Sequence, residues 1–508
     1  MMMRLAKLFC PLLFLFVVIT NGQHHDQSAA KANGKVDLGE ISFPTSGPPE
    51  AQKHFIEGVL LLHSFEYGRA RTAFAEAIKI APNFAMAYWG DAMTYDHPIW
   101  PENDKAGALL SLARLGTSPA QRRAKANTER EKLYLDAVER LFGDGDGNAR
   151  AAAYSEAMAE LSRRFPDDLE ARAFYSLSIM GLTRTTRNAE NYIRAAKVAE
   201  AVYAKNPKHP GALHYLIHAY DDPANASLGL RAARAYGTVA RSASHAQHMP
   251  SHIFFALGLW EDSINSNIAS MKTAREAGPG GYHPLFWLVH AYLQQGKADE
   301  AMKLVTVVED DIKETPSAYA RTHLAMCRAT MLVETRGGGD PSLFAPIDPA
   351  GITALAPFAG HDLASGLEYV RRKDLAAARG LLSSIRSRAE KMKAAKTSES
   401  GNLNRYTTVT QSDIDTVAVM DQILDAAIDF VAGDRDGALK KATAAGEAED
   451  KLVFEYGPPA IVKPAWEAAA ELFLEAGKKK EAADAYRRVL KRYPNRRLAN
   501  EGLKAASN

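Results

Sequence analysis

Apolar residues along most of this chain recur at every third or fourth position, which is the spacing of one face of an amphipathic helix. The runs are rich in alanine and leucine, and several stop at a proline, as at Pro82, Pro166 and Pro207. Proline ends a helix because it lacks a backbone N–H and its ring clashes with the preceding turn. No stretch alternates apolar and polar residues for long enough to suggest a strand. The pattern predicts an all-α fold built from short helices.

One C-terminal segment carries a more specific framework of small, aromatic and breaker residues. Its members are Trp466, Phe473, Gly477, Ala482, Tyr486 and Pro494. Small residues at these places let two antiparallel helices cross, aromatic residues fill the gap between them, and the proline stops the second helix. A similar register near the N-terminus is kept by Gly58, Leu61, Ala70, Phe74 and Pro82. In both places the chain resembles the tetratricopeptide repeat family. The resemblance implies a right-handed solenoid of helix-turn-helix units with loop insertions, and a concave face on which such proteins bind ligands.

The expected organisation follows from these repeats and from breaks in them. Arg4 and Lys7 precede an apolar run over residues 8–19, which is typical of an export signal. We expect a signal peptide at 1–22, a flexible segment at 23–49, an array at 50–330 that holds the histidine cluster described below, a loop insertion at 331–360 and a second tetratricopeptide-like array at 361–508.

This organisation predicts a protein that acts outside the cytoplasm, in the periplasm or the extracellular space. No second long apolar run follows the signal, so no membrane span is expected after its cleavage, although an uncleaved anchor is an alternative. Cys10 lies inside the signal, which would leave Cys327 as the single cysteine of the mature chain. The charges are balanced and interspersed, with 62 Lys and Arg against 60 Asp and Glu, so nucleic acid is not an expected partner.

The strongest chemical signal is a two-histidine pattern that occurs twice, as His214-x-x-x-His218 and His248-x-x-x-His252. The copies are 34 residues apart (248 − 214), which is the length of one tetratricopeptide helix pair. Residues four apart share a helix face, and residues one repeat apart occupy equivalent places on neighbouring helices. His245 lies on the same stripe as the second pair. The five imidazoles are therefore predicted to converge.

Four further residues are predicted to share the concave face with this cluster. His63 and His97 are also 34 residues apart (97 − 63), and His290 occupies the same place in its own repeat. Asp221 follows His218 by three residues and is expected on its helix face. Five other histidines are interpreted as core or hydrogen-bonding residues: His54, His209, His283, His323 and His361.

Histidines four apart on a helix provide two ligand arms for a metal ion, and two facing helices provide four. Imidazoles with a carboxylate suit zinc, copper or iron, and the segment offers no thiolate. Asp222 and Glu261 are candidate general bases beside such an ion. The segments around the histidines also resemble a subgroup of exported bacterial tetratricopeptide proteins. That resemblance supports the fold and the export, and leaves the chemistry to the residues.

The leading hypothesis is an exported repeat protein with a histidine-rich site for a metal and for a small-molecule or peptide ligand on its concave face. A metal-dependent hydrolase or oxidoreductase that uses the same histidines is the first alternative. A scaffold whose histidines contact a protein partner is the second. No P-loop, dinucleotide fingerprint or serine-hydrolase elbow supports a nucleotide enzyme or a nucleophilic hydrolase.

Overall fold

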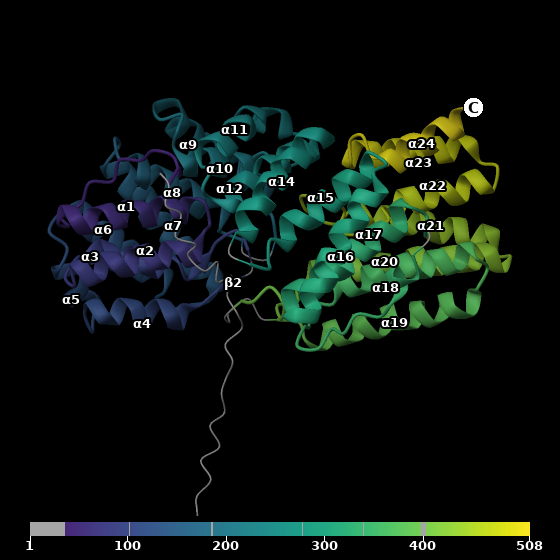
Figure 1. Cartoon of the computed structure of the whole chain (residues 1–508), viewed down its shortest axis with the longest axis horizontal. Coiled ribbons are helices and arrows are strands. Elements are labelled where there is room, and N and C mark those ends of the chain that lie inside the picture. Colours follow the sequence, from purple (N-terminus) through teal and green to yellow (C-terminus); the bar gives the residue numbers. More distant parts are fainter. Residues whose placement is uncertain (1–35, 101, 184–185, 277, 339, 398–402) are drawn as a thin grey trace, which may run out of the picture.

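The computed structural model describes residues 36–508 except 101, 184–185, 277, 339 and 398–402. The predicted signal at 1–22 and residues 23–35 lie outside the described residues. The described chain is almost entirely helical, as the apolar spacing predicted (Figure 1). Its N-terminal elements are α1 (Pro49–His63), α2 (Tyr67–Ile80), α3 (Ala85–Met93), β1 (Asp96–His97), β2 (Glu102–Asn103), α4 (Lys105–Leu115), α5 (Pro119–Ala124), α6 (Glu129–Leu141), α7 (Gly147–Arg164), α8 (Leu169–Met180) and α9 (Ala189–Lys205).

The central helices carry most of the histidines. They are α10 (Pro210–Ala219), α11 (Ala226–Val239), α12 (Ser244–His248), α13 (Pro250–Ala256), α14 (Trp260–Arg275), α15 (Tyr282–Gln294), α16 (Ala298–Glu314) and α17 (Ala318–Glu334). The C-terminal elements are η1 (Pro341–Phe344), α18 (Ala356–Arg371), α19 (Leu375–Ala394), α20 (Gln411–Ala432), α21 (Arg435–Glu449), α22 (Ala465–Glu475), α23 (Lys479–Arg492) and α24 (Arg497–Ser507).

Consecutive helices pack as pairs, and each pair packs on the next. The most extensive contacts join α1 with α2, α8 with α9, α20 with α21 and α22 with α23. Short turns connect the members of each pair, so the two helices must run antiparallel. Gly258 and Gly296 form two of these turns with φ of 66° and 73°, a region that residues with a Cβ rarely adopt. The result is a helical solenoid whose N-terminal helices lie at one end of Figure 1 and whose C-terminal helices lie at the other.

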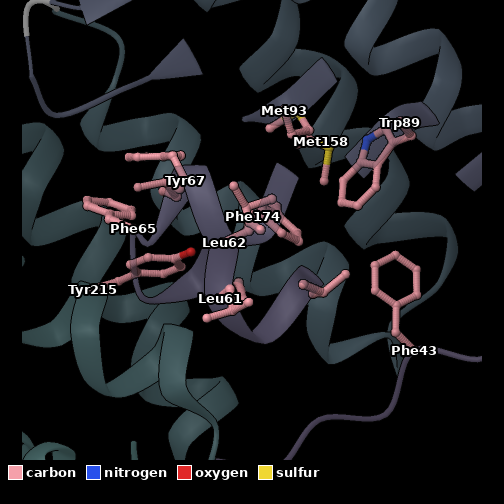
Figure 2. Packing of buried hydrophobic residues seen from close by; sticks show 14 of the residues in the cluster. Phe43, Leu61, Leu62, Phe65, Tyr67, Trp89, Met93, Met158, Phe174 and Tyr215 are labelled. Carbon is pink, nitrogen blue, oxygen red and sulfur yellow. The ribbon is translucent and has the colours of Figure 1, made fainter. Parts of the chain in front are cut away.

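The N-terminal core includes residues that precede the first helix (Figure 2). Phe43 is buried and meets Phe55 and Trp89 at ring-centroid distances of 5.1 and 5.7 Å. Leu38 is buried as well, and the Glu40 N–H donates to the carbonyl of Lys208 at 3.1 Å. The expected flexible segment therefore needs correction, because its described part, residues 36–48, is held in place by burial and by backbone hydrogen bonds.

Segments without repeat periodicity pack against parts of the chain that are far away in sequence. The β1–β2 ribbon pairs Asp96 with Asn103, and the Asn103 N–H also donates to the Leu403 carbonyl at 3.1 Å. The loop between α21 and α22 lies so close to α15 that a Cβ at Gly457 would collide with the Trp287 indole. Before α24, the Asn495 carbonyl accepts from the Trp260 indole N–H at 3.2 Å. Parts of the chain far apart in sequence thus meet around α13 and α15.

The loop insertion expected at 331–360 is placed between α17 and α18, with the short helix η1 inside it. Helix α17 extends to Glu334 and α18 begins at Ala356, so the helices take a few residues from each end of that range. Within the described residues, no helix combines the length and the apolar character needed to cross a membrane.

Candidate metal centre

Six histidines from four helices of the central part of the chain meet inside the solenoid. Helix α10 supplies His214 and His218, and α12 supplies His245 and His248. Helix α13 supplies His252, and α15 supplies a sixth imidazole, His283. The imidazoles form two groups of three, and within each group one nitrogen of every ring lies within 4.8 Å of the other two. We call these groups the first triad (His214, His218, His245) and the second triad (His248, His252, His283).

The two triads are neighbours. Between them, the ring centroids of His218 and His252 are 5.6 Å apart, and those of His245 and His248 are 6.1 Å apart. Within the first triad, Nε2 of His214 lies 3.2 Å from Nε2 of His245. Within the second, Nε2 of His248 lies 3.1 Å from Nε2 of His252. The five histidines that the repeat period predicted to converge are therefore close together in the structure.

Four of the six imidazoles are buried, and His245 and His283 are part-buried beside a cavity, so most of the cluster does not lie on the open groove that was expected. His214, His218, His248 and His252 are each 2% exposed or less. The Trp287 ring packs on His252 at 4.3 Å, and the Tyr456 ring packs on it from the α21–α22 loop at 5.1 Å. Trp287 belongs to the repeat helix α15, whereas the loop that carries Tyr456 has no repeat periodicity, so the sequence pattern does not indicate that this loop covers the imidazoles.

Three of the imidazoles are oriented by an acceptor at Nδ1. The Nδ1 of His248 lies 2.7 Å from the Asn267 side-chain oxygen, and that amide's nitrogen donates to the Ser263 carbonyl at 2.9 Å. The Nδ1 of His252 lies 2.5 Å from the Asp221 carboxylate. The Nδ1 of His214 lies 2.7 Å from the backbone carbonyl of His63. Each acceptor places the ring proton on Nδ1 and leaves a lone pair on Nε2.

The second triad therefore has an electrostatic problem that a cation would solve. With protons fixed on Nδ1 of His248 and His252, the two Nε2 lone pairs point at each other across 3.1 Å. Two acceptors at this distance repel, unless one ring takes a second proton or a cation lies between them. Burial opposes the second proton at His248, because desolvation is the main reason that its pKa is held well below the ordinary value.

The first triad contains a fully buried imidazole without hydrogen bonds. His218 is 1% exposed, and neither of its ring nitrogens has a hydrogen-bond partner among the described residues. Burial, followed by the neighbouring His214 and His252, holds the pKa of His218 well below its ordinary value, so the ring is neutral. A buried polar group left unpaired costs about 1–3 kcal/mol, so the arrangement calls for a partner that the protein itself does not supply.

A third group of potential ligands, formed by His63, Glu170 and His209, behaves differently. Nε2 of His63 and of His209 lie 2.7 and 3.2 Å from the two oxygens of the Glu170 carboxylate. Nδ1 of His63 lies 2.8 Å from the Tyr215 hydroxyl, and Nδ1 of His209 accepts from the Ala212 N–H at 3.2 Å. Both nitrogens of His63 and Nδ1 of His209 are hydrogen-bonded, whereas Nε2 of His209 faces the Glu170 carboxylate at ion-pair distance without hydrogen-bond geometry. The carboxylate thus lies between two imidazoles and links α1, α8 and the start of α10.

We expect Glu170→Gln to destabilise the protein by about 2 kcal/mol, because an amide nitrogen would then face an imidazole N–H. Burial alone would raise the pKa of Glu170, but charge and hydrogen bonds from His209 and His63 outweigh it and lower the pKa to about 2. A lowered carboxylate pKa stabilises the fold above the unfolded value of 4.5, and this contribution is lost as the pH falls toward 2. Urea unfolding at pH 7 and pH 3 measures both effects. The control is Glu160→Gln, at an exposed pair with Arg163, which should change neither.

The other predicted site residues take separate positions. His97 stacks on Tyr67 at 3.7 Å and lines a cavity beside the triads. His290 packs against Phe255 at 5.0 Å and is not in either triad. Asp222 binds Arg187 at 3.3 Å in the turn after α10.

The structure does not bring Glu261 to the histidines. Its side chain is 66% exposed and hydrogen bonds to the Gln295 amide at 2.9 Å. Of the two candidate bases and the four groove residues, only Asp221 contacts an imidazole of a triad through its side chain, and it acts there as the acceptor for His252.

The pattern-based interpretation missed His283 and Asn267. His283 follows His248 by 35 residues (283 − 248), one more than the repeat length, so a strict period of 34 places it out of register. The chain around residue 280 contains glycines with positive φ, and these accommodate the additional residue before α15. An interval allowed to vary by one residue would have found it. Asn267 lies on the second helix of its pair, α14, where no histidine marks the position.

Comparison with known families agrees with the helix-pair architecture. The family model described as tetratricopeptide repeat matches residues 465–496, which correspond to α22, α23 and the turn that follows. The match identifies one tetratricopeptide repeat in the C-terminal part of the chain. A search of curated proteins found no match.

The solved structures that are similar to this chain are distant from it. The chain is 11% identical to the P58(IPK) TPR domain, with 90% of this chain and 97% of that one covered and a TM-score of 0.20. It is 10% identical to a human IFIT1 dimer with m7Gppp-AAAA, with 92% and 91% covered and a TM-score of 0.38. It is 9% identical to yeast Tom70, with 90% and 88% covered and a TM-score of 0.33. At these values the neighbours carry no argument about the function of this chain.

Proposed function

We propose that this tetratricopeptide-repeat protein binds two transition-metal ions, one in each histidine triad. The observation that carries the proposal is the facing pair of Nε2 lone pairs of His248 and His252, whose protons are held on Nδ1 by Asn267 and Asp221. A histidine that ligates a metal ordinarily donates its other ring N–H to a carboxylate, amide or carbonyl acceptor in this way.

The spacing of the nitrogens supports the same proposal. A metal with bonds of about 2.0–2.1 Å to imidazole nitrogen holds tetrahedral ligand atoms about 3.3 Å apart. The Nε2 separations of 3.2 Å in the first triad and 3.1 Å in the second are close to this value. His218, with two unpartnered nitrogens, would gain the missing interaction as a ligand in the first triad.

Three imidazoles for each ion leave coordination positions for a small ligand, which is typical of reactive rather than structural sites. Imidazole ligands suit zinc, copper and iron, and two such ions side by side can act on one bound molecule. This geometry therefore favours a metal-dependent enzyme over a protein in which the metal has only a structural role.

Metal analysis of the purified full-length protein tests the proposal. We expect about two equivalents of one transition metal for each chain by inductively coupled plasma mass spectrometry, and two adjacent anomalous peaks at the triads in crystals. A chain that binds no zinc, copper or iron, with an imidazolium at His252 seen by nitrogen NMR, would refute it. That outcome would leave the interaction scaffold, which the repeat architecture alone supports.

We expect Asp221→Asn to weaken binding of the ion in the second triad by about 10–100-fold, because the carboxylate that orients the His252 ring is lost. Competition with a chromophoric chelator measures the change. The matched control is Asp222→Asn, whose side chain pairs with Arg187 and not with an imidazole. Equal weakening in both variants would contradict an orienting role for Asp221.

We also propose that the protein acts after export, on the basis of the charged and apolar pattern of residues 1–22. N-terminal sequencing of the protein from a periplasmic or secreted fraction tests this, with an expected start near residue 23.

A further inference from the structure

A cavity of about 170 Å³ lies against both triads. One wall is made of His245 from the first triad and of His248 and His283 from the second. A molecule in this cavity would therefore face both proposed metal ions at once. The volume is close to the roughly 150 Å³ of an apolar cavity that accommodates a single benzene ring.

The other walls are aromatic and planar. Phe65 and Trp100 both line the cavity and both touch His245, with ring centroids 5.6 and 5.5 Å away. Tyr319 and Tyr67 contribute further ring surface. Faces and edges of aromatic rings pack well against a flat aromatic ligand, by stacking or edge-to-face contact.

The charged side chains around the cavity favour an anion. Arg405 lies over the Trp100 ring at 4.9 Å and pairs with Glu102 at 2.9 Å. Arg69 faces Glu66 at 3.9 Å, whereas Arg71 is bonded to the Thr94 hydroxyl and carbonyl. The cavity lining thus contains three guanidinium groups and two carboxylates, which is an excess of one positive charge.

Trp100 and Arg405 also limit the length of the ligand. Both side chains line a second cavity of about 360 Å³ on the other side, between the N-terminal and C-terminal helices. A ligand longer than one ring would have to displace this partition.

We propose that the cavity binds a one-ring aromatic anion, an aryl carboxylate or phenolate, with its ring against the edge-to-face pair of Phe65 and Trp100 and its anionic group facing Arg405 and the triads. This inference rests on the proposed metal site for the identity of the histidine wall. It assigns the class of small molecule that the metal centre would act on or hold.

Calorimetric titration of the full-length, metal-analysed protein with benzoate tests the inference. We expect saturable one-site binding in the submillimolar range, at least tenfold weaker binding of cyclohexanecarboxylate, which lacks a flat ring, and at least tenfold weaker binding of 2-naphthoate, which is too long. Arg405→Gln should weaken benzoate at least tenfold. Arg388→Gln should not, although Arg388 is also paired with a carboxylate, Asp362, and also lies over an aromatic ring, Phe358.

The two proposals fail in different measurements. Protein that holds two ions but does not bind benzoate, or that binds all three carboxylates equally in every variant, overturns the aromatic-anion inference and leaves the metal site intact. Protein without metal overturns the metal site. Phe65→Leu, which keeps an apolar side chain, should also weaken the binding of benzoate. It replaces Arg405→Gln as the test if that variant does not fold.

Discussion

Replacing His218 with alanine is expected to remove one of two metal ions from the protein and to leave the other. His218 supplies the first triad with an imidazole that has no hydrogen-bond partner, so its loss takes away a ligand and disturbs no network. Two remaining imidazoles hold a transition metal much more weakly than three. The measured content should fall from about two equivalents to about one.

His252→Ala should have the corresponding effect on the second triad, and the double variant His218→Ala, His252→Ala should bind no metal. Circular dichroism and thermal unfolding show whether each variant is folded when its metal is measured. The control is His290→Ala, a buried histidine of the same central helices that belongs to neither triad.

The pattern of losses distinguishes one ion from two. If a single ion were shared by all six imidazoles, either single replacement would reduce the content from one equivalent toward zero. Loss of metal from His290→Ala as well would mean that the effect follows stability and not ligation. Full metal content in the double variant would refute ligation by the triads.

The fold was predictable from sequence because it depends on local spacing. Apolar residues at helical intervals, the framework around Trp466 and the prolines that stop helices all act within one helix pair, and the tetratricopeptide match at 465–496 covers one such pair. The segment before α1 was misjudged because the burial of Phe43 depends on Trp89 and Tyr134, which come much later in the chain.

The site was predictable in part for the same reason. His214 and His248 are related by the repeat length, so the period brings their helices together in register. The contact of Tyr456 with His252 was not predictable, since Tyr456 lies in the α21–α22 loop, which has no repeat periodicity. Glu261 follows His252 by nine residues (261 − 252), but the turn at Gly258 lies between them and the Glu261 carboxylate faces solvent.

Closure also changes the chemistry that the histidines can perform. On an open concave face, water would satisfy free imidazole nitrogens and the rings would titrate near their ordinary pKa. Burial lowers the pKa of His214 to about 3, mainly by desolvation, so that imidazole keeps its lone pair in mildly acidic solution. Burial thus keeps His214, His218 and His248 in the neutral form that can ligate a metal.

Arg496, in the turn between α23 and α24, should be essential for stability. We expect Arg496→Met to destabilise the protein by about 3–5 kcal/mol, because it removes one partner from a buried ion-pair network. Arg496 is 1% exposed, its Nε lies 2.6 Å from Glu467 in α22, and its Nη1 lies 2.7 Å from Glu334 in α17. The neighbouring Asn495 is bonded to Trp260 beside α13, so the network joins the C-terminal repeat to the helices that carry the second triad.

Urea unfolding followed by circular dichroism measures this loss, and metal content measured below the transition shows whether the remaining folded protein keeps its ions. We expect it to keep them, since Arg496 does not touch an imidazole of either triad. The matched control is Arg488→Met, which removes a guanidinium that is 57% exposed and pairs with Asp450 at 3.3 Å. A similar midpoint shift for both variants would contradict the network, because an exposed pair contributes about 1 kcal/mol at most, whereas the loss of Arg496 leaves two buried carboxylates with weaker partners.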